Sequence, residues 1–379
     1  MENLFQNNSI MKRSQVFLIA LLISIVSCTS KVEKPKVEEK TISEFEFGVW
    51  TTANNKKSNE AYAQEFEKYK NAGIDEVLIN TGTDPVLLNR ITPIAIEKGL
   101  KVHAWIMTMN RPGDSIALTH PEWYAVSKEG KSCFDTRPYV EYYQWLCPTR
   151  KESRNHILGL VEGLAKIDGI ESVHLDYIRF SDIFLPIGLL PKYNLKQETE
   201  MPEFDFCYCD VCISEFEKIH HKNPKESGNT SIDMEWKQFR LNAVKRVVDE
   251  AYEIVHKYNK NLTAAVFPYP EMADHMVRQR WDKWNIDEVY PMIYHGFYNE
   301  EIDWIGFATK QGVEDVKDKG IGVNTGIYIP PFKSNEELKK AILLAKENGA
   351  KGVTFFDGNA LTKEYLQTIK ETKESLKEK

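Results

Sequence analysis

The sequence predicts a (β/α)8 barrel with long insertions after the third and fourth strands. Eight short apolar segments alternate with segments of helical periodicity, and this alternation is typical of a parallel sheet. The chain has 379 residues, which is enough for one such barrel with insertions, and it shows no internal repeat of fixed period. The expected strands cover residues 45–50, 76–80, 101–107, 169–180, 262–267, 288–294, 321–329 and 352–357.

The segments between these strands carry helix signals. The expected helices cover residues 59–72, 84–99, 150–166, 234–258, 272–284, 302–319, 334–348 and 362–379. Ser334 and Glu337 have the spacing of a capping box, and Gly349 follows the same helix. Pro93 lies inside the second helix and is expected to kink it.

Two connections are longer than ordinary loops. Residues 111–149 are rich in Trp, Tyr, His and Pro, and residues 181–233 carry prolines and a cysteine cluster. Loops of this length in a compact domain are usually functional. We therefore expect residues 45–379 to form one catalytic barrel, with both insertions at its active face.

The N-terminus has the pattern of a targeting segment. Lys12 and Arg13 precede an apolar run, residues 16–26, that is too short to span a membrane comfortably and ends before Cys28. Residues 1–28 resemble a bacterial lipoprotein signal, which implies that Cys28 is lipidated; an ordinary secretory signal cut nearby is the alternative. Residues 29–44 are a charged tether with no acidic residue directly after Cys28. This pattern resembles sorting to the outer membrane, where we expect a lipid-anchored protein.

Composition narrows the class of partner. Hydrophobic residues make up 42% of the chain, as in a globular domain, and the formal net charge is -7. A protein that binds nucleic acid usually carries a basic patch, so nucleic acid is not an expected partner.

The fourth expected strand places polar side chains at the mouth of the barrel. Val173 and Leu175 alternate with His174 and Asp176, so one pair faces the covering helices and the other faces the interior. Active sites in this fold lie at the carboxyl ends of the strands, which favours a chemical role for Asp176. The alternative is that Asp176 only pairs with Arg179 or caps the next turn.

Five short motifs carry a family resemblance. They are His120-Pro-Glu-Trp123, Lys128-Glu-Gly-Lys131, Leu146-Cys-Pro148, Val173-His-Leu-Asp-Tyr-Ile-Arg-Phe180 and Tyr290-Pro-Met-Ile-Tyr294. In their order and spacing the chain resembles the glycosyl-hydrolase-like barrel family of bacterial lipoproteins. The resemblance implies a TIM barrel that acts on carbohydrate, with Asp176 in the active site.

Glycoside hydrolysis usually needs two carboxyl groups, one as acid and one as nucleophile or base. We expect Asp176 to be the nucleophile or base and Glu271, on a proline-bracketed turn after the fifth strand, to be the acid. The alternative for Glu271 is a charge at the start of the next helix. Asp357 is the rival second carboxylate, followed by Asp182 and Asp274.

Further side chains near the strand ends are candidates for substrate binding. Aromatic faces beside a few polar groups suit sugar rings, although such residues also fill barrel cores. The candidates are Trp50, His103, Trp105, His174, Arg179, Tyr290, Tyr294, His295 and Asp357.

The cysteines form a separate question. Cys207, Cys209 and Cys212 make a C-x-C-x-x-C cluster, which together with Cys147 could hold a tetrahedral structural zinc. Export to an oxidising compartment favours disulfides instead, with Cys133 as a further partner. Neither alternative makes a cysteine catalytic, and no cofactor is expected for catalysis.

Three functions remain in competition. The leading one is a glycoside hydrolase that cleaves a poly- or oligosaccharide with two carboxylates. The second is a non-catalytic glycan-binding lipoprotein. The third is a metal-dependent hydrolase with His103, His174, Asp176 and His295 as ligands.

Overall fold

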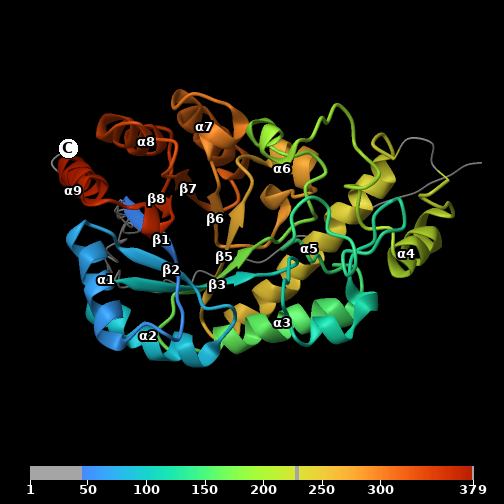
Figure 1. Ribbon diagram of the computed structural model, residues 1–379, viewed down its shortest axis with the longest axis horizontal. Coiled ribbons are helices and arrows are strands. Elements are labelled where there is room, and N and C mark those ends of the chain that lie inside the picture. The colour runs from blue at the N-terminus through green and yellow to red at the C-terminus, as the bar shows by residue number, and fades with distance from the viewer. Residues whose placement is uncertain (1–44, 227–229, 378–379) are drawn as a thin grey trace, which may run out of the picture. The chain divides into compact units, whose positions relative to one another are not determined.

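Eight parallel strands close into a barrel in chain order in the computed structural model, which describes residues 45–226 and 230–377 (Figure 1). The strands are β1 (Glu46–Thr52), β2 (Glu76–Asn80), β3 (Lys101–Met107), β4 (Ser172–Asp176), β5 (Asn261–Val266), β6 (Glu288–Pro291), β7 (Gly322–Tyr328) and β8 (Gly352–Phe356). Pairing of β8 with β1 closes the sheet. The predicted (β/α)8 fold is confirmed.

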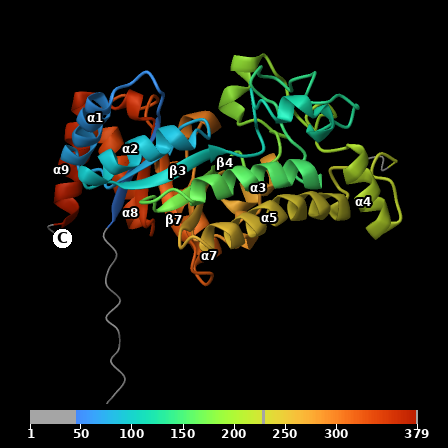
Figure 2. The same cartoon turned by 90° about the horizontal axis from the view of Figure 1, so that it is seen from below.

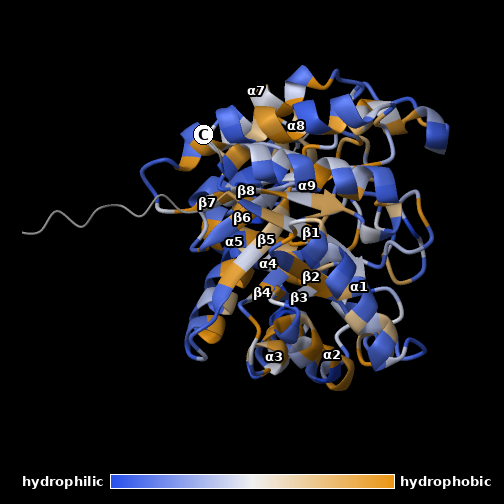
Figure 3. Cartoon of the chain, turned by 90° about the vertical axis from the view of Figure 1, so that its left-hand side faces the viewer, coloured by the Kyte–Doolittle hydropathy of each residue, from blue (hydrophilic) through white to orange (hydrophobic). Residues whose placement is uncertain are grey.

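Helices cover the outside of the barrel, with their polar faces turned to solvent and the apolar strands inside (Figure 3). They are α1 (Asn59–Asn71), α2 (Pro85–Glu97), α3 (Lys151–Ala165), α5 (Met234–His256), α6 (Pro270–Val277), α7 (Asp303–Val316), α8 (Asn335–Glu347) and α9 (Lys363–Lys377). A further helix, α4 (Asp210–His220), belongs to the connection between β4 and α5 and lies away from the strands (Figure 1). Helix α6 is shorter than expected because Arg278 adopts a left-handed φ of 52°. Helix α4 was not expected from the sequence.

Local signals explain where several helices begin. The Ser334 hydroxyl accepts the Glu337 amide at 3.2 Å, and the Glu337 carboxylate accepts the Lys333 amide at 2.7 Å. The first bond satisfies a donor that the first turn of α8 leaves free, and the second connects the residue before the N-cap to the helix. Helix α2 continues through Pro93.

The barrel has two apolar regions. The larger fills the layer between strands and helices, and includes Phe47 and Val77. The smaller lies inside the barrel, where Trp50, Trp105 and Tyr290 pack together with Leu78 and Ala265. The aromatic side chains therefore fill the middle of the barrel and separate its two ends.

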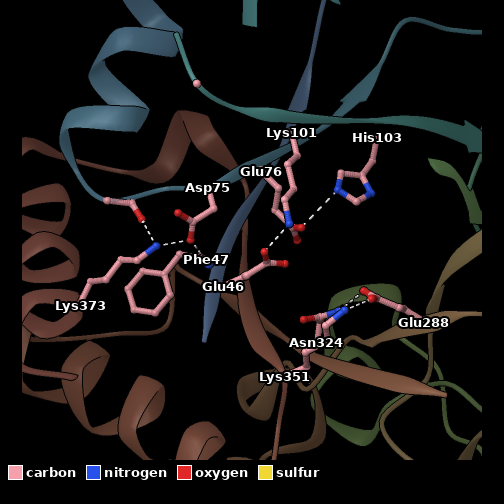
Figure 4. Close-up of polar contacts among 12 residues, drawn as sticks. Glu46, Phe47, Asp75, Glu76, Lys101, His103, Glu288, Asn324, Lys351 and Lys373 are labelled. Carbon is pink, nitrogen blue, oxygen red and sulfur yellow. Dashed lines mark hydrogen bonds and ion pairs between the residues drawn. The ribbon is translucent and has the colours of Figure 1, made fainter. Parts of the chain in front are cut away.

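The amino-terminal end of the barrel is closed by a network of charged side chains, which we call the barrel floor (Figure 4). His103 Nε2 lies 3.2 Å from Glu76 Oε2, and the Tyr290 hydroxyl donates to Glu76 Oε1 at 3.1 Å. Glu288 accepts a bond of 2.8 Å from the Asn324 amide and pairs with Lys351. Each buried charge in the floor has an opposite charge or a donor beside it, as burial requires.

Two long segments extend from the opposite, carboxyl-terminal end. The β3–α3 segment covers residues 108–150, and the β4–α5 segment covers residues 177–233, of which 227–229 are not described. They lie side by side (Figure 2), because Ser127 pairs with Phe206 and the Tyr208 amide donates to the Val126 carbonyl at 2.7 Å. The two segments thus form one unit above the barrel.

The predicted lipoprotein signal, Cys28 and the tether lie outside the described residues. Among the helices that are described, none combines the length and the apolar character needed to cross a membrane.

Candidate active site

A cavity of about 420 Å³ opens at the carboxyl-terminal end of the barrel. Side chains at the ends of several strands line it, among them Trp50 on β1, Asn80 on β2, Trp105 on β3, Asp176 on β4 and Phe356 on β8. The two long segments and the loops after β5 and β6 supply the rest of the wall. The cavity therefore lies where this fold normally places its chemistry.

Asp176 is a carboxylate at the base of this cavity. Only 8% of the residue is exposed. Its Oδ2 accepts the Trp105 indole N–H at 3.1 Å, and its Oδ1 accepts the Tyr177 amide at 2.7 Å. Tyr177 has a φ of 52°, a left-handed conformation that a residue with a side chain rarely adopts and that is common at functional sites. The backbone turn after β4 thus holds the carboxyl group in one orientation.

Burial raises the pKa of Asp176 to about 6, because the ionised form loses its hydration. The Tyr177 amide, the charge of Arg179 and the Trp105 indole all act in the opposite direction without cancelling the effect of burial. Asp176 therefore changes its protonation state close to neutral pH, as a general acid or base must.

Asp182 is the second carboxylate among the described residues that line the cavity. Its Oδ2 accepts hydroxyl bonds of 2.5 Å from Tyr139 and 2.9 Å from Tyr143, and lies 3.4 Å from Arg179 Nη1. The two tyrosines come from the β3–α3 segment and Asp182 from the β4–α5 segment. This network therefore joins both segments at the cavity wall.

Arg179 connects the two carboxylates. Its guanidinium pairs with Asp182 and acts electrostatically on Asp176. The group is buried between aromatic rings, 4.9 Å from the ring centre of Trp145 and 5.0 Å from that of Phe267. Such cation–π contacts fix the position of the charge.

Aromatic side chains form most of the remaining cavity surface. Those from the strand ends and the loops that follow them are Tyr294, Phe297, Tyr298, Tyr328 and Phe356, and those from the two segments are Tyr139, Tyr142, Tyr143, Tyr177 and Tyr193. Tyr294 and Phe356 stack with ring centres 5.8 Å apart. A surface of rings with hydroxyl groups at its edges can contact both the apolar faces and the polar groups of a ligand.

Besides Asp182, which the sequence named as a lower-ranked candidate for the second carboxylate, the structure brings five of the predicted site residues to this cavity. They are Trp50, Trp105, Asp176, Arg179 and Tyr294. All five lie at or just beyond the carboxyl end of a strand, which is the position that selected them in the sequence.

Three other predicted residues lie deeper in the barrel and do not line the cavity. His103 and Tyr290 belong to the barrel floor. His174 Nε2 accepts the Trp50 indole N–H at 3.2 Å, and its Nδ1 lies 2.9 Å from the Thr263 hydroxyl. Since burial also holds the pKa of His174 well below its usual value, the ring is neutral and both nitrogens are engaged.

The remaining predicted residues lie elsewhere. Glu271 sits in the first turn of α6, with its side chain 57% exposed and 3.9 Å from Arg280, and does not line the cavity. Pro270 starts the helix directly before Glu271, so the side chain is an N-terminal helix charge. Asp357 accepts the Asn359 amide as a cap of the next turn. His295 packs on Phe332 at 5.3 Å, outside the cavity lining.

Several cavity residues were not selected from the sequence. Asn80 and Tyr328 are the last residues of strands β2 and β7. They could have been selected from the sequence, because active-site residues in this fold lie at the carboxyl ends of the strands. Tyr139 and Tyr143 belong to a connection whose length and composition already indicated function. Tyr193 lies in an irregular segment without any such signal, and only the folded chain brings it to the cavity.

Metal-binding potential is confined to the cysteines within the described part of the chain. The sulfur atoms of Cys147, Cys207, Cys209 and Cys212 all lie within 4.8 Å of one another, and all four residues are buried. No group built from His103, His174, Asp176 and His295 is found among the described residues. The structure therefore gives no support to the metal-dependent hydrolase alternative, which required these four side chains to converge.

A family model described as glycosyl hydrolase-like 10 matches residues 40–340, more than half of the chain. No curated protein matches the sequence.

Several solved structures with a similar fold are glycoside hydrolases, at low sequence identity. The glycoside hydrolase domain of PgaB (BpsB) from Bordetella bronchiseptica has a TM-score of 0.64 at 12% identity, over 86% of this chain and 98% of that one. The catalytic domain of β-amylase from Paenibacillus polymyxa has a TM-score of 0.60 at 10% identity, over 86% and 95%. The endo-β-1,4-mannanase from Thermotoga petrophila has a TM-score of 0.54 at 12% identity, over 88% and 77%. At these identities the likeness shows the fold.

Proposed function

This chain belongs to the glycosyl hydrolase-like 10 family, and we propose that it is a glycoside hydrolase that cleaves a poly- or oligosaccharide with Asp176 and Asp182. The observation that carries the proposal is a buried carboxyl group with a pKa of about 6 at the base of an aromatic cavity. A carboxyl group of this kind can keep its proton near neutral pH and donate it to a leaving oxygen.

In this proposal Asp176 acts as the general acid rather than as the nucleophile or base that the sequence suggested. Asp182 takes the place that the sequence assigned to Glu271, since Glu271 lies outside the cavity lining. Two tyrosine hydroxyls and Arg179 compensate the charge of Asp182, which lets it act as the carboxylate partner of the protonated Asp176. The aromatic surface would hold the sugar rings.

One observation favours a second candidate, a glycan-binding protein without catalysis. Asp182 already has three protein partners and is 3% exposed, which also fits an anchor that only holds the cavity wall. In that case the cavity would bind a glycan, and no second carboxylate from its lining would complete the reaction.

Product release from a panel of plant, algal and host glycans separates the two candidates. We expect the parent protein to release sugar from at least one glycan, and Asp176→Asn and Asp182→Asn to bind that glycan without releasing product. Binding by all three proteins with no release by the parent would instead establish the glycan-binding function. Release by the parent and Asp182→Asn, but not by Asp176→Asn, would assign Asp182 to the anchor role.

We also propose that a lipid on Cys28 anchors the chain at the outer membrane, with the barrel in the periplasm or at the cell surface. The support is the sequence pattern alone, Lys12-Arg13, the apolar run and Cys28. Labelling of cells with palmitate, followed by membrane fractionation, tests this proposal. Cys28→Ala should lose both the label and the membrane association.

A further inference from the structure

We propose that Cys147, Cys207, Cys209 and Cys212 bind one structural zinc ion that holds together the two segments forming the cavity wall. The four residues come from two distant parts of the chain. Cys147 ends the β3–α3 segment just before α3, whereas Cys207 and Cys209 precede α4 and Cys212 lies in its first turn.

The distances between the sulfur atoms fit a shared metal ion. Cys147 Sγ lies 3.6 Å from Cys209 Sγ and 3.5 Å from Cys212 Sγ, and all four sulfurs fall within 4.8 Å of one another. A tetrahedral site with Zn–S bonds of about 2.3 Å has sulfur–sulfur edges of about 3.8 Å. A disulfide requires a sulfur–sulfur distance of about 2.05 Å. The described cysteines form no disulfide.

The surroundings of the cluster suit thiolate ligands. The Val126 amide donates to Cys207 Sγ at 3.4 Å, and Cys209 is the N-cap of α4, whose first turn carries amides without helical partners. The half-buried Arg150 stands beside Cys147 and Cys209 and interacts electrostatically with both. A site with four thiolates carries a net negative charge on zinc, and these groups compensate it.

The cluster is connected to the aromatic wall of the cavity through Phe204. Phe204, three residues before Cys207, contacts the Tyr139 ring at 5.8 Å, and Tyr139 contacts the Tyr193 ring at 5.0 Å. Tyr139 and Tyr193 line the cavity from the two different segments. Residues 108–150 and 177–226 are long and mostly irregular, so a metal crosslink between them would hold the two parts of the wall together.

Metal content tests the proposal directly. The full chain, purified in detergent without a histidine tag, should contain one zinc per chain by inductively coupled plasma mass spectrometry. Cys209→Ser and Cys212→Ser should each contain none. Cys133→Ala removes a buried cysteine outside the cluster and should keep one zinc. Iron in place of zinc, zinc retained by the cluster variants, or cluster cysteines found in disulfides would overturn the proposal.

A second measurement uses only the parent protein, in case the variants fail to fold. Exchange of the bound metal for cobalt(II) should produce the absorption bands of a tetrahedral tetrathiolate site, and their absence would contradict the assignment. Hydrogen exchange of the parent before and after chelation tests the structural role. Faster exchange should be confined to residues 108–150 and 177–226; exchange unchanged there, or raised equally in the barrel strands, would exclude the role as crosslink.

Discussion

Glu76 and Asp176 are two buried carboxylates inside the same barrel, and their pKa values shift in opposite directions. Glu76 lies in the barrel floor, where His103 and Tyr290 lower its pKa despite complete burial. Asp176 lies at the base of the cavity, where burial raises its pKa to about 6. Both residues are buried carboxylates on strands, so the difference between their pKa shifts arises from the groups that contact each of them.

The partners explain which end can react. The Glu76 carboxylate has a histidine whose own pKa is raised by the pairing, so both charges persist and stabilise each other. The Asp176 oxygens accept bonds from an indole and a backbone amide, neither of which carries a full charge. A carboxyl group with neutral partners keeps the ability to take up and lose a proton, whereas a paired one is a structural element.

The largest expected effect is on catalysis at the cavity. Asp176→Asn keeps the shape of the side chain but cannot donate a proton as an acid, so product release should fall by about 10³-fold. Initial rates on the glycan identified by the panel measure this effect. Glu271→Gln is the matched control and should stay within about twofold of the parent, because its exposed side chain lies outside the cavity lining. A large loss in Glu271→Gln would restore it as the acid.

The pH dependence of catalysis should show the raised pKa of Asp176. If Asp176 must be protonated to act, kcat/KM should fall by about tenfold per pH unit above pH 6, as the acid form is lost. A pH–rate profile from about pH 5 to about pH 8 covers the raised pKa of Asp176 and measures this fall. A profile that stays flat above pH 6 would contradict the acid role.

Removal of the Glu76 carboxylate from the barrel floor should reduce stability more than it reduces activity. Glu76→Gln leaves His103 buried without its opposite charge, and we expect a loss of about 3 kcal/mol in the free energy of unfolding. Urea denaturation measures this change, and kcat of the folded protein should remain close to that of the parent. Glu46 and Lys101 form a more exposed ion pair at the same end of the barrel (Figure 4). Glu46→Gln breaks this pair and should cost less than about 1 kcal/mol. Equal losses of unfolding free energy in the two variants would show that burial does not determine how much an ion pair contributes to stability.

Asp176→Asn should have the opposite effect on stability, and the effect should depend on pH. The folded pKa of about 6 exceeds the usual 3.8, so the folded state holds the proton more tightly and the parent loses stability as pH rises from about 4 to 6. Above this window the ionised group destabilises the fold by about 3 kcal/mol, the free-energy equivalent of the difference between the two pKa values. Urea denaturation of both proteins at pH 4 and pH 8 compares them. If Asp176→Asn is no more stable than the parent at pH 8, burial of the ionised carboxylate does not destabilise the fold.

Local pattern was sufficient to predict the barrel and the position of Asp176. Alternation along residues 173–176 reports which side chains face the interior, and the order of strands and helices requires a parallel sheet. Capping residues such as Ser334 act within one turn, so their role is readable from a few neighbouring positions. These features depend on contacts close in the chain.

The second carboxylate and the cavity wall were decided by the tertiary structure. Glu271 and Asp182 both follow a strand in sequence, but the first begins an outward-facing helical turn and the second meets Tyr139 and Tyr143, about forty residues earlier in the chain. The pKa of Asp176 likewise depends on its burial among side chains from several strands. Irregular segments have no periodicity that reports their path, so their long-range contacts become known only when the chain is folded.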